Sequence, residues 1–383
     1  MRVEYRLFTP DGDIPVDPQI LALPFKITPF TAHPFLTLGD YFEAIETFLL
    51  RHNGRSLESA LHQALHTSIR VSPMDTLLIR SEKHGAFYHV ASIEMTRPEE
   101  RIKLAVSTAL SPAARACLHR EYHLLQSLGR SHPLPYLPAA YALGQVDRKK
   151  KEGRQSLLMV LTEWFEAFHE WHTTFDSTDG CRKIRIWDGG NHPPYLSQED
   201  AFQLFREAAK ILTLYYDPKT YRQIYPWHHA AGDFVVSTRA HAMQVRLATV
   251  RKYESVMNAF TPGPVNPFIA MVYFLLNLTI RMRLDRMDGV GDTVWAEDFA
   301  VEATLQGFLE ALYIMQQERR FTLCEVNELL SLLRSFRLPE LETLFESLCG
   351  LYADQDPEEY GLIQARLRPH VKRLHQALQE YPR

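Results

Sequence analysis

Two adjacent histidines and an aspartate lie within one stretch of six residues, close enough along the chain to share a reaction. An imidazole accepts a proton at neutral pH, and a carboxylate can hold a metal ion. His228 or His229 is therefore a candidate base, and Asp233 is a candidate metal ligand. A tetrahedral metal site would need a further ligand, for which His241 is the nearby candidate. The alternative is that one histidine bonds a loop carbonyl and the other packs beside Trp227.

Several common catalytic motifs are not found in the sequence, which narrows the chemistry. There is no GxxxxGK(S/T), no GxGxxG after a strand and no GxSxG, so P-loop, Rossmann and α/β-hydrolase readings have no support. His169 and His172 flank Glu170, but they are three residues apart, whereas the zinc-protease motif HExxH places its histidines four apart. A zinc-protease site is therefore not expected.

Four aromatic side chains lie close together in the sequence, in this order: Trp164, Phe165, Phe168 and Trp171. They could line a ligand cleft, or they could close a hydrophobic core. The sequence favours neither role over the other.

The composition indicates an ordinary globular protein with more core than one small unit can hold. Of the 383 residues, 46% are hydrophobic, and the net charge is -4, so the overall charge gives no reason to expect a nucleic-acid partner. The one basic run, residues 148–151, lies between two strand-like segments and is interpreted as a solvated hairpin tip. We expect two or three packed units.

Three features of the sequence concern its location in the cell. The most apolar stretch, residues 268–280, is about 13 residues long, whereas a membrane-spanning helix needs roughly 20. We therefore expect a buried core helix there and no membrane partner. The N-terminus has no apolar segment typical of a secretory signal, and the cysteines are scattered without CxxC spacing. A reducing compartment fits this cysteine usage best, so we expect a cytoplasmic protein.

Hydrophobic periodicity divides the chain into three parts. Residues 1–75 predict a helical N-terminal extension. Residues 76–165 predict a β-rich part in which one helix, residues 113–128, follows the third of five strands. Residues 166–383 predict a mainly helical part with a few short strands. The expected fold class is α+β.

Local signals predict where some helices begin and end. In the first part, the pattern indicates two separate helices, at residues 38–51 and 56–69. In the third part, Ser197 is a predicted N-cap, because Asp200 follows three residues later at the start of an apolar-periodic segment.

Four segments carry a resemblance to one known family. They are Arg-Glu-Tyr-His-Leu-Leu at residues 120–125, Pro-Ala-Ala-Tyr-Ala-Leu-Gly at 138–144, the strand-like residues 157–163, and Pro-Trp-His-His-Ala-Ala-Gly-Asp-Phe-Val-Val at 226–236. In that order they resemble the small-lobe helix, the strand after it, the fifth strand with the hinge, and the catalytic loop of protein-kinase-like proteins of the aminoglycoside phosphotransferase branch. The usual form of that loop is H-G-D-x-x-P-x-N. The resemblance covers about residues 75–280 and implies a bilobal fold with a small β-rich N-lobe and a large helical C-lobe.

The resemblance assigns nucleotide-binding roles to residues of the predicted N-lobe. It places Glu121 at the helix glutamate that orients a lysine, although Glu121 could instead be a surface residue beside its neighbour in the chain. The lysine itself is either Lys103 or, in the strand register that we prefer, is replaced by Ala105. Ala105 lies two residues after Lys103 and therefore on the same face of the strand. Glu163, at the hinge, is a further candidate for cofactor binding.

In the predicted C-lobe, the resemblance puts unusual residues at the catalytic positions. Asp233 stands where the family has a metal-binding asparagine, and His228, five residues earlier, stands where it has the catalytic aspartate. The second metal-binding aspartate falls near Ala248 or Thr249, neither of which carries a carboxylate. With too few oxygen ligands for Mg²⁺, conventional phosphoryl transfer should be slow.

The sequence therefore predicts a pseudokinase-like protein that binds a protein or small-molecule ligand in the inter-lobe cleft. If a cofactor binds, the resemblance implies ATP with Mg²⁺. The alternative is an atypical phosphoryl or nucleotidyl transferase, with Asp233 as the metal ligand and His228 or His229 as the base. A third hypothesis is that the kinase resemblance is accidental and that the helical second half is an interaction domain.

Overall fold

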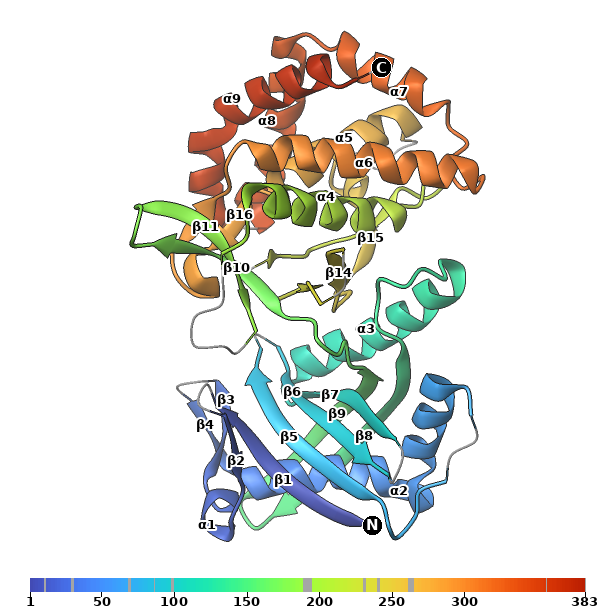
Figure 1. Ribbon diagram of the computed structural model, residues 1–383, viewed down its shortest axis with the longest axis vertical. Coiled ribbons are helices and arrows are strands. Elements are labelled where there is room, and N and C mark those ends of the chain that lie inside the picture. The colour runs from blue at the N-terminus through green and yellow to red at the C-terminus, as the bar shows by residue number, and fades with distance from the viewer. Residues whose placement is uncertain are drawn as a thin grey trace. The chain divides into compact units, whose positions relative to one another are not determined.

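The computed structural model describes residues 1–9, 12–28, 31–67, 70–85, 87–97, 100–188, 195–229, 232–239, 242–260, 265–355 and 357–382. Its mixture of helices and strands confirms the predicted α+β class. The chain divides into two compact units, Met1–Glu166 (unit 1) and Ala167–Arg383 (unit 2), and Figure 1 labels most of their elements.

A seven-stranded sheet is the centre of unit 1. The strand order is β2-β1-β5-β6-β7-β9-β8, and neighbouring strands are antiparallel except for β1 and β5, which are parallel. The strands are β1 (Arg2–Thr9), β2 (Gly12–Pro15), β5 (Thr76–His84), β6 (His89–Thr96), β7 (Arg101–Ala109), β8 (Ala140–Lys150) and β9 (Gly153–Glu163).

The N-terminal residues belong to this sheet, which differs from the predicted helical extension over residues 1–75. Alternate residues of β1, namely Val3, Tyr5 and Leu7, pack against the core of unit 1. A short helix α1 (Pro18–Leu21) and a hairpin of β3 (Pro24–Thr28) and β4 (Thr31–Thr37) follow β2. The expectation missed β1 because its partner β5 is far away in the sequence, so no local turn signals the pairing.

Helix α2 (Leu38–Leu65) occupies the segment where two helices were predicted. It begins with a capping box, in which the Asp40 N–H donates to Thr37 Oγ1 at 3.2 Å and the Thr37 N–H donates to Asp40 Oδ2 at 2.7 Å. Gly54 has φ of 82°, in the left-handed region that glycine adopts without strain. The helical backbone is therefore interrupted between the two predicted segments.

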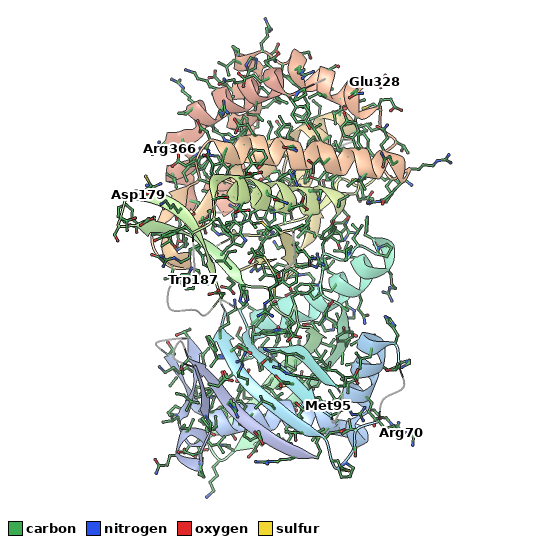
Figure 2. All side chains as sticks on the ribbon, viewed as in Figure 1. Arg70, Met95, Asp179, Trp187, Glu328 and Arg366 are labelled. Carbon is green, nitrogen blue, oxygen red and sulfur yellow. The ribbon has the colours of Figure 1, made fainter. Side chains whose placement is uncertain are left out.

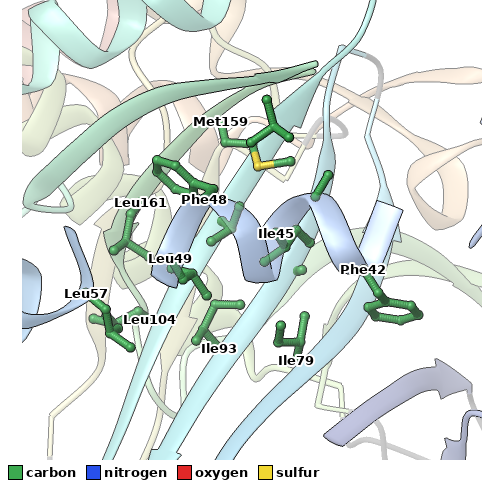
Figure 3. Packing of buried hydrophobic residues seen from close by; sticks show 14 of the residues in the cluster. Phe42, Ile45, Phe48, Leu49, Leu57, Ile79, Ile93, Leu104, Met159 and Leu161 are labelled. Atoms are coloured by element: carbon green, nitrogen blue, oxygen red, sulfur yellow. The ribbon is translucent and has the colours of Figure 1, made fainter. Parts of the chain in front are cut away.

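The core of unit 1 lies between α2 and one face of the sheet. Figure 3 shows the side chains of α2 packed against those of the strands. Those labelled on the helix are Phe42, Ile45, Phe48, Leu49 and Leu57, and those on the strands are Ile79, Ile93, Leu104, Met159 and Leu161. Burial of this apolar surface is the main stabilising contribution in the unit.

Helix α3 (Pro112–Ser131) packs on the opposite face of the sheet. Successive residues of a strand point to opposite faces. In β7, Leu104 belongs to the core with α2, whereas Ala109 packs with Leu118 of α3. Lys103 and Ala105 therefore lie on the face where α3 packs.

The basic run between β8 and β9 forms a hairpin tip, as predicted. Lys150 pairs with Gly153 at the end of the two strands. Its Nζ lies 2.6 Å from Asp40 Oδ2, and Arg148 Nη2 lies 3.5 Å from a carboxylate oxygen of Glu43. Part of the positive charge of this hairpin is thus neutralised within unit 1.

Unit 2 combines six longer helices with short two-stranded sheets among its described residues. The helices are α4 (Gln198–Leu214), α5 (Pro267–Arg281), α6 (Phe299–Gln317), α7 (Val326–Ser335), α8 (Leu338–Gln355) and α9 (Pro357–Glu380). The paired strands are β10 (Glu170–Asp176) with β11 (Cys181–Trp187), β12 (Arg222–Ile224) with β15 (Tyr253–Ser255), β13 (Phe234–Ser237) with β14 (Gln244–Leu247), and β16 (Leu284–Arg286) with β17 (Thr293–Trp295).

Two predictions about the helices of unit 2 are confirmed. Ser197 caps α4, because its Oγ accepts from the Asp200 N–H at 3.1 Å. The apolar stretch forms α5, most of whose residues are buried. Within the described part of the chain, no helix combines the length and the apolar content needed to cross a membrane.

Helices α4 and α6 approach each other closely at Gly307. A Cβ atom on Gly307 would lie 2.1 Å from the backbone oxygen of Arg206 in α4. A carbonyl of a helix cannot move aside as a flexible side chain can. The contact between the two helices therefore requires a residue without a side chain at this position.

We expect Gly307→Ala to destabilise unit 2 by about 1–3 kcal/mol, since α4 and α6 must separate to admit the methyl group. Gly350→Ala in α8 is the matched control, because nothing lies within 4 Å of its Cβ position. That change should stabilise the helix by up to about 1 kcal/mol. Denaturant unfolding followed by tryptophan fluorescence measures both, because every tryptophan except Trp164 belongs to unit 2. Equal changes in the free energy of unfolding for the two substitutions would contradict the close approach of α4 and α6.

Candidate functional site

The predicted catalytic histidines and aspartate all lie in unit 2, in the loop between β12 and β13. This loop reaches from Tyr225 to Asp233, and its residues 230–231 lie outside the described part, as does His241. The aspartate stands directly before β13, so the hairpin of β13 and β14 fixes its position. The chemistry of the described part of the loop depends on three side chains: His228, His229 and Asp233.

Asp233 is held by an arginine in the interior of unit 2. Its side chain is 1% exposed, and Arg251 donates to both carboxylate oxygens, with Nη2 at 2.5 Å from Oδ1. The His228 N–H also donates to Asp233 Oδ2, at 2.8 Å. The carboxylate that was predicted to hold a metal ion thus has a guanidinium beside both of its oxygens.

His228 belongs to a second group of charges. Its Nε2 lies 2.7 Å from Glu359 Oε1, and Arg281 Nη1 lies 2.8 Å from Glu359 Oε2. Burial alone would raise the pKa of Glu359, but the His228 hydrogen bond and the Arg281 charge outweigh it and lower that pKa to about 2. The group joins the loop to α5 and α9, which are distant in the sequence.

His229 packs inside an aromatic cage. Its ring centre lies 4.4 Å from that of Trp171, 5.4 Å from that of Trp227 and 5.5 Å from that of Phe205. Burial lowers its pKa to about 3, so the ring is neutral near pH 7. The alternative in which one histidine packs beside Trp227 is the arrangement found here. Trp171, from the predicted aromatic cluster, closes the core at this point.

Of the other two histidines that the sequence drew attention to, His172 lies on a strand, whereas His169 precedes it. His172 is in β10, and its ring meets that of Trp187 in β11 edge-on, with centres 5.3 Å apart (Figure 2 labels Trp187). His172 Nδ1 lies 3.7 Å from Asp285 Oδ1 in β16. His172 is thus enclosed by side chains of β11 and β16.

No metal centre is evident in the described residues, which contain no group of three or more histidine, cysteine, aspartate or glutamate side chains placed to hold an ion. The positions where the family resemblance puts the second metal-binding aspartate follow β14. There the Ala248 N–H donates to the Asp233 carbonyl at 2.7 Å. This position therefore contributes a backbone hydrogen bond to the loop.

The predicted nucleotide-binding residues of unit 1 have partners other than those expected. Lys103 Nζ lies 3.9 Å from Glu82 Oε1 and 4.1 Å from the centre of the Trp164 ring. Burial, with Arg80 nearby, lowers the pKa of Lys103, although Glu82 opposes this effect. The carboxylate within ion-pair distance of Lys103 is thus that of Glu82, not that of Glu121.

Glu121 and Glu163 have structural surroundings. Glu121 is 5% exposed and faces Tyr88, whose pKa is raised by burial and by the Glu121 charge. The alternative interpretation, in which Glu121 is a surface residue, is therefore wrong. Glu163 Oε2 accepts from the Ala139 N–H at 3.2 Å, and the Glu163 N–H donates to the Ala139 carbonyl at 2.8 Å. Glu163 thereby ties the end of β9 to the start of β8.

Sequence reasoning missed the residues that neutralise the loop, namely Arg251, Arg281 and Glu359. Acidic and basic residues alternate along residues 357–380, a pattern typical of a solvated helix face, yet Glu359 is 7% exposed. A comparison with models of known protein families found no match, and a comparison with curated proteins found none either. The function is therefore inferred from these residues and their geometry.

We expect Arg251→Met to destabilise unit 2 by about 3–5 kcal/mol, because it leaves the buried Asp233 carboxylate without a positive partner. Adding Asp233→Asn should recover part of the loss, since the amide removes the charge and keeps an acceptor for the His228 N–H. Arg337→Met is the control: its side chain is 81% exposed beside Glu340, and exposed ion pairs contribute little to stability. Chemical denaturation measures all three. An Arg251→Met loss no larger than the control would refute the role of the pair.

We expect Glu359 to make unit 2 sensitive to acid. Its ordinary pKa is 4.5 and its folded value is about 2. A lowered carboxyl pKa contributes stability that is fully present above pH 4.5 and is lost as the pH falls toward 2. Between these limits the free energy of unfolding should therefore fall more steeply in the wild type than in Glu359→Gln.

Denaturant unfolding at a series of pH values tests this expectation. Glu358→Gln is the matched control, because that neighbouring side chain is 80% exposed and pairs only with Arg286 among the described ion pairs. Its pH profile should run parallel to that of the wild type. If the Glu359→Gln profile is also parallel, the group around Glu359 does not lower the pKa of this carboxyl.

Proposed function

We propose that this chain is a pseudokinase-like protein that binds a protein or small-molecule ligand and does not carry out conventional phosphoryl transfer. The proposal includes a bilobal, protein-kinase-like plan of the aminoglycoside phosphotransferase type. Two features support that plan: the division into two compact units, and the helix α3 after the third of the strands β5, β6, β7, β8 and β9.

The observation that carries the proposal is the double pairing of Asp233 with Arg251. Mg²⁺ needs free oxygen ligands near 2.1 Å, and it is dehydrated reluctantly. To bind it, Asp233 would have to give up a two-pronged, charge-assisted bond in a site from which water is largely excluded. Such an exchange would leave the Arg251 guanidinium close to the bound cation, where like charges repel.

The residue in the position of the catalytic base supports the same conclusion. His228 is engaged with Glu359, which is bonded on its other oxygen to Arg281. A base must reach the hydroxyl group from which it takes a proton. The atypical transferase alternative would require Asp233 to leave Arg251, and either His228 to leave Glu359 or the buried His229 to leave its aromatic cage. No contact of the described residues favours it.

The proposal predicts that ATP with Mg²⁺ or Mn²⁺ will not raise the melting temperature in a metal-dependent way. A ligand that binds only the folded state at about one hundred times its Kd would stabilise the protein by about 2.7 kcal/mol, which is readily detected. Thermal melting should be measured for the wild type and for Asp233→Asn, with ATP, with metal and with both.

The controls separate nucleotide binding from transfer. A shift with ATP that is the same with and without metal would identify ATP as the small-molecule ligand and agree with the proposal. A shift that needs the metal and disappears in Asp233→Asn, or release of ADP upon incubation with candidate acceptors, would refute it in favour of the transferase.

A further inference from the structure

A pair of histidines lies on the exposed side of α3 in unit 1. His119 and His123 are four positions apart on a regular helix, so their side chains lie on the same face. Both side chains are exposed, and their ring centres are 4.6 Å apart. Solvent can therefore reach both rings from the same side.

We propose that His119 and His123 form a surface site for one divalent transition-metal ion of the Cu²⁺, Ni²⁺ or Zn²⁺ class. Metal–imidazole bonds are about 2.0–2.1 Å, which places two rings that share an ion roughly 4.5–5 Å apart, centre to centre. The observed separation already lies in this range. The rings are inclined at 64° to one another, so ion binding requires rotation about the side-chain torsions to direct one nitrogen of each ring at a common point.

The donor atoms determine which metals the site takes. Two imidazoles without a carboxylate favour borderline transition metals over Mg²⁺ and Ca²⁺, which prefer oxygen ligands. Between the transition metals, affinity at nitrogen donors rises to Cu²⁺ and falls again at Zn²⁺. Two protein ligands leave the remaining coordination positions to water, so the ion should exchange readily. The site is independent of the pseudokinase proposal, because it uses none of its residues.

The chain contains a matched comparison for this geometry. His62 and His66 have the same spacing in the sequence, but His66 ends α2 in the left-handed conformation, with φ of 57°. His62 Nδ1 also lies 2.9 Å from the Thr67 carbonyl oxygen. His62 and His66 therefore do not share a helical face as His119 and His123 do. Comparing the two pairs separates the effect of the sequence spacing from the effect of the helical geometry.

Calorimetry tests the site. The untagged protein is titrated with Cu²⁺, Zn²⁺ and Mg²⁺ in the presence of glycine, which competes for the metal. We expect one Cu²⁺ bound per chain, weaker binding of Zn²⁺ and none of Mg²⁺. His119→Ala or His123→Ala should each weaken Cu²⁺ binding at least about tenfold, because the second imidazole acts at a high effective concentration. His62→Ala should leave the affinity unchanged.

Electron paramagnetic resonance of the Cu²⁺ complex provides a second readout, in which coupling to two imidazole nitrogens should be lost in either α3 variant. Thermal melting without metal should show that both variants fold, since both side chains are exposed. Cu²⁺ affinity that is retained in the double variant His119→Ala, His123→Ala, or that falls equally in His62→Ala, would overturn the proposal.

Discussion

Unit 2 is organised around the requirement that a carboxylate removed from water must have a positive partner. Asp233 is almost fully buried, and Arg251 provides that partner while the His228 N–H completes its hydrogen bonds. A buried carboxylate without such a partner costs several kcal/mol. The loop before β13 therefore keeps its conformation only while the arginine stays in place, and the same bond that fixes the loop occupies the atoms a metal would need.

The same principle links parts of the chain that are far apart. Glu359 in α9 is shared between His228 in the loop and Arg281 in α5, so one buried charge holds three segments together. In unit 1, Lys103 is enclosed between Glu82 and Trp164 in a comparable way. Residues whose types suggest chemistry are thus engaged, in each unit, in bonds that stabilise its own fold.

Much of the fold could be predicted because the relevant signals are local. Strand β7 alternates between buried and more exposed residues, β9 has an uninterrupted apolar run over residues 157–161, and helices such as α4 carry their own caps. The strands that were missed lack such signals. In β10, residues 171–174 are all buried, but His172, Thr173 and Thr174 are polar, so the segment shows neither an alternating pattern nor an apolar run. In β1, the pairing with β5 is parallel and depends on residues more than sixty positions away.

The site could be predicted only in part, for a related reason. Spacing identified His228, His229 and Asp233 as one group, and the structure does place them in a single loop. Spacing could not identify Arg251 or Glu359, because the contacts with them form only when the unit folds. Yet these partners decide the chemistry. An aspartate whose neighbours are carboxylates and water can bind a metal ion, whereas an aspartate paired with an arginine stabilises the loop in which it lies. A resemblance between segments transfers the position of a residue, whereas its role depends on the charge that folding places next to it.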